Sequence, residues 1–252
     1  MTDPLLGHRF PAICDPNALP SRVLVLAAHP DDEVIGIGGL LAFHGQRGDR
    51  VRVVHATRGD AGDPGARHQE IAKLREDELR RALAELGLAP GENLGYGDGA
   101  LAQHLDPLTR DLRTLFEEDA PELLYVFHAG EYHSDHRSLA QAAFDARMAL
   151  PEACRILLFG VNQVVPFGDL YEYSARVESK RRALACFESQ LAYLDFASKV
   201  MHRDQAATVN VELPEITHAE LILETCRSGW QDHVESSRRA LLAADPSARG
   251  EA

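Results

Sequence analysis

The segment Ala28-His29-Pro30-Asp31-Asp32-Glu33 places a histidine and three acids directly after the apolar run 22–27. A valine- and leucine-rich run bounded by prolines predicts a buried parallel strand, and ligands collect beyond the carboxyl ends of such strands. Capping of the next helix would explain one acid. It does not explain a histidine three residues before Asp32 with another acid between them, so the segment indicates a functional site.

A second cluster, His133-Ser134-Asp135-His136, follows a second apolar run at 123–127. If both runs are strands of one parallel sheet, both clusters open on the same edge and can meet around one ion. Two imidazoles and one carboxylate form the ligand set of a catalytic zinc, which keeps its fourth position for water. A loop histidine alone is more often a surface residue, but two matching clusters together predict a metal site.

The two motifs together resemble the PIG-L/LmbE-like family of zinc-dependent N-deacetylases, whose members remove acetyl or related acyl groups from amino sugars. The similarity covers residues from about 22 to 150. The segment Thr57-Arg58-Gly59-Asp60-Ala61-Gly62 is similar to the family's loop after the second strand, and Lys180 to Gln190 is similar to a later helix. Many relatives have proline where this chain has Ser134, a change expected to loosen that loop without touching a ligand.

The resemblance implies His29, Asp32 and His136 as zinc ligands, Asp31 as general base and His133 as the group facing the developing oxyanion. Physical reasoning agrees, because neighbouring side chains diverge and Asp31 is left free to accept a proton from water acidified by zinc. A cationic His133 would stabilise the oxyanion of a tetrahedral intermediate. Iron or cobalt are alternatives to zinc, since mixed nitrogen and oxygen ligands accept them.

Three further residues have roles implied by the same resemblance. Arg75 matches an arginine that faces substrate, and Asp98, in Gly95-Tyr96-Gly97-Asp98-Gly99, matches an aspartate that contacts sugar hydroxyls. Without the resemblance, a surface ion pair and a turn aspartate would be the simpler interpretations. Asp135 is close enough to a histidine to fix the tautomer of an imidazole, and which imidazole it serves is open.

Composition favours an acidic enzyme of one domain. The chain has 252 residues and a formal charge of −13, which disfavours a binder of nucleic acid or of anionic lipid. No apolar stretch approaches the roughly 18 residues of a membrane span, and the first twenty residues lack the pattern of a secretory signal, so we expect a cytoplasmic protein. We expect an N-terminal arm at 1–21, an LmbE-like domain at 22–244 and a flexible tail at 245–252.

Apolar runs alternate with amphipathic stretches, a pattern that predicts a Rossmann-like three-layer α/β/α fold with a mostly parallel sheet. Strands are expected near 22–28, 51–56, 92–96, 122–127 and 155–160, and helices near 34–47, 68–87, 107–118, 136–149 and 176–194. The loop 59–65 is expected to be mobile and close to the site. The run Gly36-Ile37-Gly38-Gly39 lacks dinucleotide-binding spacing and favours close helix packing.

The favoured function is hydrolysis of an N-acetylated amino sugar or its conjugate by water that zinc activates. The alternatives are an amidase of a thiol conjugate built on an amino sugar, and a non-catalytic sugar- or metal-binding protein. Metal binding alone requires neither Asp31 nor His133, so their presence argues against the last.

The cysteines are widely spaced and are expected to be reduced packing residues; they are Cys14, Cys154, Cys186 and Cys226. A structural role is expected for His128, and His218 is a weak candidate for approaching the site.

Overall fold

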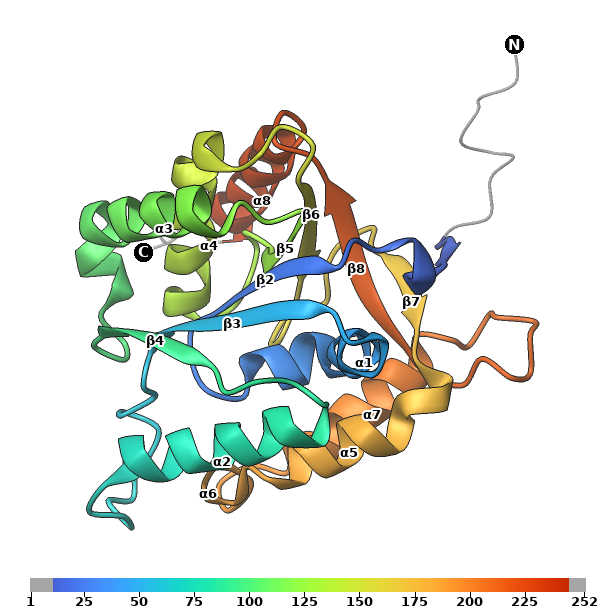
Figure 1. Cartoon of the computed structure of the whole chain (residues 1–252). Coiled ribbons are helices and arrows are strands. Elements are labelled where there is room, and N and C mark those ends of the chain that lie inside the picture. The colour runs from blue at the N-terminus through green and yellow to red at the C-terminus, as the bar shows by residue number, and fades with distance from the viewer. Residues whose placement is uncertain (1–10, 245–252) are drawn as a thin grey trace.

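Five adjacent parallel strands, in the order β6-β5-β2-β3-β4, form the larger part of the sheet in the computed structural model, which describes residues 11–244 (Figure 1). They are β2 (Arg22–Ala27), β3 (Arg50–Thr57), β4 (Glu92–Tyr96), β5 (Leu123–Phe127) and β6 (Arg155–Phe159). Every residue of β5 is buried, as are the last five residues of β2. The continuous apolar runs therefore belong to strands covered on both faces, and these five strand predictions are confirmed within two residues at each end.

Three more strands complete the sheet, in the order β1-β7-β8-β6-β5-β2-β3-β4. They are β1 (Ile13–Cys14), β7 (Asp169–Glu172) and β8 (Ala219–Thr225). β8 runs antiparallel to both of its neighbours, β6 and β7. The sequence analysis predicted none of the three, because two are very short and β8 mixes polar with apolar residues. The mostly parallel sheet is nevertheless confirmed.

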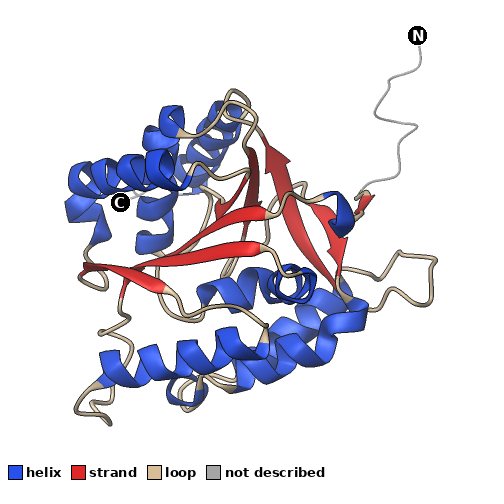
Figure 2. Ribbon diagram, in the orientation of Figure 1, coloured by secondary structure: helices blue, strands red, loops and turns tan. Residues whose placement is uncertain are grey.

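Helices cover both faces of the sheet (Figure 2). One face carries α1 (Asp32–Arg47), α2 (Ile71–Glu85), α5 (Val177–Ala185), α6 (Glu188–Leu191) and α7 (Phe196–Ala206), and the other carries α3 (Leu105–Asp119), α4 (Ser134–Ala146) and α8 (Trp230–Ala244). Short 3₁₀ turns lie at Pro16–Ala18, Leu101–His104, Arg147–Ala149 and Ser174–Arg176. The predicted three-layer architecture is confirmed.

The last predicted helix, 176–194, is wrong as a single element. The chain leaves the helical path between α5 and α6, where Phe187 inserts its fully buried ring into the core. Helices α7 and α8 were not predicted.

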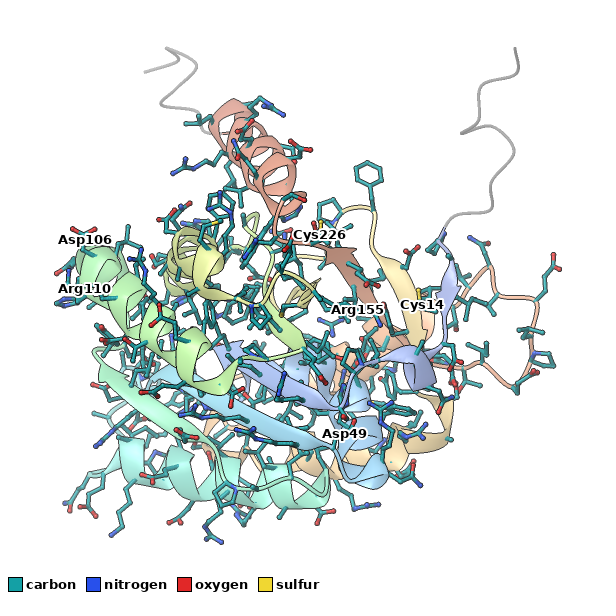
Figure 3. The ribbon with its side chains drawn as sticks, turned by 45° about the horizontal axis from the view of Figure 1, so that its top comes forward. Cys14, Asp49, Asp106, Arg110, Arg155 and Cys226 are labelled. Carbon is teal, nitrogen blue, oxygen red and sulfur yellow. The ribbon has the colours of Figure 1, made fainter. Side chains whose placement is uncertain are left out.

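The amphipathic pattern of α3 shows how the sequence positions the layers. Leu108, Leu112 and Phe116 recur at four-residue spacing and are completely buried. Asp106 and Arg110 lie on the exposed outer side of the same helix (Figure 3). The helix therefore packs its apolar stripe against its neighbours and exposes its opposite, polar side to solvent.

The glycines of α1 permit close packing, as the sequence predicts. A Cβ on Gly36 would overlap the ring of Phe159 on β6, and a Cβ on Gly39 would overlap Tyr173. Helix α1 is also kinked, since Ile37 has φ −138° and ψ 23° inside the helix. Its first turn is thus separated from the rest.

The part of the expected N-terminal arm that the structure describes joins the sheet edge, because Ile13 and Cys14 pair with β7. The boundary expected at residue 22 remains a prediction, and the expected tail 245–252 lies outside the described residues. Among residues 11–244, no helix is long and apolar enough to cross a membrane.

Candidate metal centre and active site

The site lies where the five parallel strands end. The loops after β2, β3, β4, β5 and β6 all contribute to one pocket of about 720 Å³, through residues such as His29, Gly62, Asp98, His133 and Asn162. Strands β2 and β5 are neighbours, with β3 and β4 on one side and β6 on the other. The pocket therefore sits where the strand order reverses, which is where open α/β sheets bind ligands.

Asp32 lies between the two histidines that the sequence paired with it. Its Oδ2 is 3.2 Å from His29 Nδ1, and its Oδ1 is 3.2 Å from His136 Nε2. Tetrahedral zinc with bonds of about 2.0–2.1 Å requires neighbouring donors about 3.3 Å apart. Ring nitrogens of His29, His133 and His136 also lie within 4.8 Å of one another, so His133 stands beside the predicted ligands. The donor atoms of His29, Asp32 and His136 are close enough together to hold one divalent ion.

The ring nitrogen that each histidine turns away from Asp32 contacts another carboxylate. His29 Nε2 is 3.0 Å from Asp98 Oδ1 and 3.2 Å from Asp135 Oδ2. His136 Nδ1 is 3.1 Å from Oε2 of Glu131. Metal-binding histidines characteristically donate the second N–H to a carboxylate, which fixes the tautomer and makes the imidazole a better ligand. This arrangement supports His29 and His136 as ligands.

The surrounding acids determine the electrostatics of this cluster. Burial disfavours the charged imidazolium of His29, but hydrogen bonds to Asp135, Asp32 and Asp98 outweigh burial and raise its pKa well above the usual value. For His136, burial is opposed by Asp32 and Glu131, and its pKa rises to about 9. Burial would raise the pKa of Asp32, yet the two imidazoles hold it well below its usual range. The cluster thus attracts positive charge, whether protons or a metal ion.

Asp31 occupies the N-cap position of α1 without making a side-chain capping bond, so capping does not explain this acid. Its backbone has φ +136°, a conformation that non-glycine residues rarely adopt. Its carboxylate lines the pocket and accepts a 3.0 Å hydrogen bond from Arg75. Burial raises the pKa of Asp31 to about 7, with Arg75 opposing and the charge of Asp32 adding to the shift.

Arg75 is only 3% exposed and donates three hydrogen bonds to neighbouring segments of the protein. Besides Asp31, it donates to the carbonyls of Pro30 and Gly59 at 2.7 and 3.1 Å. A Cβ on Gly59 or Gly62 would overlap its guanidinium, so both glycines permit the loop after β3 to pack closely on it. Arg75 therefore holds Asp31 and this loop in place. It also lines the pocket, and sugar binding by Arg75 remains a prediction.

Asp98 and Asp135 both serve His29, which answers the question that the sequence left open. Asp135 is completely buried and also accepts hydrogen bonds from the backbone of Gly99 and Leu101. Asp98 accepts a 3.0 Å hydrogen bond from the backbone of Ala61 and lines the pocket. Contact between Asp98 and sugar hydroxyls remains a prediction.

His133 caps α4 and faces the pocket. Its Nδ1 accepts a 3.2 Å hydrogen bond from the backbone of Asp135, so in the neutral ring the proton is assigned to Nε2. Burial lowers the pKa of His133, and the positive charges of His29 and His136 lower it further. The structure thus favours a neutral N–H donor, where the sequence analysis expected a cation.

Sequence reasoning missed Glu131, which is completely buried beside the centre. Its carboxylate contacts His136 and accepts hydrogen bonds from the backbone of Val161, Asn162 and Gln163, the loop after β6. The only sequence signal was an acid two residues before His133. The pocket wall formed by Phe196, Lys199 and Val200 was not predicted either, since these residues lie on α7, and no role was predicted for Tyr193 and Leu194 beside them.

The remaining candidates lie outside the pocket. His128 is buried and its Nδ1 accepts from the backbone of Gly130, while His218 packs against Tyr173. The loop 59–65 lies at the pocket, as expected, and the side chains of Gln190 and Tyr193 bond to its backbone. Its predicted mobility remains a prediction. All four cysteines are free.

Comparison with known proteins agrees with the two motifs. The family model PIG-L, described as GlcNAc-PI de-N-acetylase, matches residues 24–147. A Bacillus anthracis protein named "Probable N-acetyl-alpha-D-glucosaminyl L-malate deacetylase 2" is 30% identical over 185 residues, which cover 68% of this chain and 82% of that relative.

Solved structures share the fold at lower identity. The N,N'-diacetylchitobiose deacetylase of Pyrococcus horikoshii gives a TM-score of 0.71 at 19% identity, over 82% of this chain and 84% of the other. GalB, the 4-carboxy-2-hydroxymuconate hydratase of Pseudomonas putida KT2440, gives 0.66 at 22% identity, over 81% and 95%. A hydratase and a deacetylase thus share this fold, so the reaction must be argued from the site. The extent of the Bacillus match, together with the family model, shows that this chain belongs to the PIG-L family.

Proposed function

We propose that this protein is a metal-dependent deacetylase that releases acetate and a free amine from an N-acetylated amino sugar or its conjugate. The observation that carries the proposal is the position of Asp31. This buried carboxylate faces the pocket beside the cluster of His29, Asp32 and His136 without belonging to it. A site that only bound metal would not need a second acid, held in a strained backbone, that faces the pocket without serving as a ligand.

The residues divide the chemistry among them. His29, Asp32 and His136 would hold a divalent cation, which would supply the Lewis acidity needed to polarise an amide carbonyl and to acidify a water molecule. Asp31 accepts the proton of the attacking water, and its pKa of about 7 suits a general base at neutral pH. His133 donates a hydrogen bond from Nε2 to the developing oxyanion. The proton on Asp31 then passes to the departing amine.

The donor set favours zinc as the cation, although iron or cobalt would fit the same nitrogen and oxygen atoms. The substrate class follows from the relatives, whose names describe deacetylases of N-acetylglucosamine conjugates. These names favour deacetylation over the alternative of a thiol-conjugate amidase. We place the enzyme in the cytoplasm, as its composition predicts, and cell fractionation tests this assignment.

The test is metal-dependent release of amine. Protein loaded with zinc is incubated with N-acetylglucosaminyl L-malate and with N,N'-diacetylchitobiose, and free amine and acetate are quantified. We expect equal amounts of both products from at least one substrate, loss of activity after chelation and recovery when zinc is restored. Metal-loaded protein that released no amine, or activity indifferent to chelation, would overturn the proposal.

A further inference from the structure

The pocket has two chemically different sides. One side carries the carboxylates of Asp31, Asp32 and Asp98 together with the histidines and Arg75. The other side, formed by α6, α7 and the segment between them, contributes no acid to the pocket lining; its members are Gln190, Tyr193, Leu194, Phe196, Lys199, Val200 and Arg203. A substrate that places its acetamido group among the acids therefore presents another part of itself to this α7 wall.

Three cations line the pocket, and two of them are committed to the protein. Arg75 is bonded to Asp31 and to two backbone carbonyls. Arg203 donates to Asp204 at 2.9 Å and to the carbonyls of Ile35 and Val161 at 2.8 and 3.4 Å. The charge of each guanidinium is already paired with a carboxylate, that of Asp31 for Arg75 and that of Asp204 for Arg203.

Lys199 differs from both arginines. Its side chain is exposed, and it makes no hydrogen bond or ion pair with any residue in the range 11–244. It projects from α7 between Phe196 and Val200 along the chain, and all three line the pocket. An unpaired ammonium on a wall without acids is suited to a ligand anion, because no carboxylate of the pocket lining competes for it there.

Lys199 makes no hydrogen bond or ion pair with the residues of the metal cluster, although both line the same pocket. A ligand anion paired with Lys199 therefore lies at α7 and not at the cluster. A molecule that places its N-acetyl group at the cluster would then carry its negative charge at a distance from that group. We infer that Lys199 selects amino-sugar conjugates that carry an anionic group, a carboxylate or a phosphate, remote from the N-acetyl group. The inference rests on the proposed function.

The test compares three substrates that differ in charge. They are methyl N-acetyl-α-glucosaminide, which is neutral, its carboxymethyl counterpart and N-acetylglucosamine 1-phosphate. For the wild type we expect a higher kcat/KM with one or both anionic substrates, and the larger ratio identifies carboxylate or phosphate. In Lys199→Met this ratio should fall by up to about fivefold, the range of an exposed ion pair, and in Lys199→Glu it should fall further. Rising salt should reduce the wild-type preference.

The matched control is Lys73→Met, because Lys73 is an exposed lysine of α2 that does not line the pocket. This variant should keep the wild-type ratio and hydrolyse the neutral substrate at the wild-type rate. A wild type without preference for either anion, or an unchanged ratio in Lys199→Glu, would overturn the inference while leaving deacetylation intact. Failure of the proposed function looks different, since no amine would then be released from any of the three substrates.

Discussion

Replacing Asp31 with asparagine should separate chemistry from metal binding. The amide cannot accept the proton of the attacking water, so we expect kcat to fall by about 10²–10⁴-fold. This corresponds to about 3–5 kcal/mol in the activation barrier. The ligand atoms of His29, Asp32 and His136 are untouched, and metal content should therefore remain at the wild-type level.

The structure also limits the side effects of this substitution. The asparagine oxygen can still accept the 3.0 Å hydrogen bond from Arg75, which keeps its two carbonyl acceptors. Asparagine is among the residues that best tolerate positive φ. Burial already disfavours the charged form of this carboxylate, and the neutral amide keeps the hydrogen bond, so the unfolding free energy should change by no more than about 1–3 kcal/mol and the variant should remain folded.

The assay is steady-state amine release, with metal content and denaturant unfolding measured on the same samples. Asp60→Asn serves as the control, because Asp60 is an exposed acid of the loop after β3 and does not line the pocket. Its kcat should match the wild type. If metal-loaded Asp31→Asn retained activity within about tenfold of the wild type, another group would be the base and the reasoning from Asp31 would be refuted.

Three other predictions concern buried charges. Glu131→Gln should weaken metal binding by about 10–100-fold in competition with a chelator, because the imidazole of His136 loses its carboxylate partner; unchanged affinity would exclude that role. Lys180→Met should lower the unfolding free energy by about 3–5 kcal/mol, because it leaves the buried carboxylates of Asp204 and Glu220 without their shared cation; a loss below about 1 kcal/mol in denaturant unfolding would contradict this. Burial lowers the pKa of His233 to about 4, so its contribution to stability is present above about pH 6.5 and is lost as pH falls towards 4. The wild type should therefore lose more unfolding free energy between pH 7 and pH 5 than His233→Gln does, by about 1 kcal/mol once the partial exposure of His233 is allowed for. Equal losses in the two proteins would refute the lowered pKa of His233.

The sequence predicted the centre of the fold because the central strands are fully buried. Val23 to Ala27 and Leu123 to Phe127 are continuous apolar runs, and a run of that length between turn residues has few other interpretations. Strand β8 gave no such signal, since Ala219–Thr225 contains three polar residues and becomes a strand by pairing with β6 and β7. Its formation depends on contacts that are distant in the chain, which local patterns do not contain.

The candidate site shows the same division. The sequence predicts that His29 and His136 lie close together, because each follows a predicted strand of one parallel sheet. The structure places both beside Asp32. The bond between Arg75 and Asp31 spans 44 residues, and Glu131 accepts bonds from residues about 30 positions away. Such partners depend on the packing of α2 and of the loop after β6, and spacing along the chain does not specify them.

The kink of α1 explains how late parts of the chain support the catalytic turn. In a regular helix the amide of Gly39 would bond to the carbonyl of Ile35. Here Gly39 donates to Glu220 of β8 at 2.7 Å, while the Ile35 carbonyl accepts from Lys180 of α5 at 3.2 Å and from Arg203 of α7 at 2.8 Å. Lys180 also pairs with Glu220 at 2.6 Å, so the broken helical bond is replaced by a buried ion cluster.

The cluster holds the first turn of α1 apart from the rest of the helix. That turn carries Asp32, and the amide of Ile35 bonds to the carbonyl of Asp31 at 2.9 Å. A backbone with φ +136° costs about 1–3 kcal/mol and persists only where its surroundings determine it. Arg75 fixes Asp31 from the side of α2, and the ion cluster fixes the same turn from β8, α5 and α7. Asp31 and Asp32 are therefore positioned by α2, which follows them by more than forty residues, and by the ion cluster, whose members follow them by more than a hundred. For this reason, the two motifs alone could predict the ligands but not the residues that hold them in place.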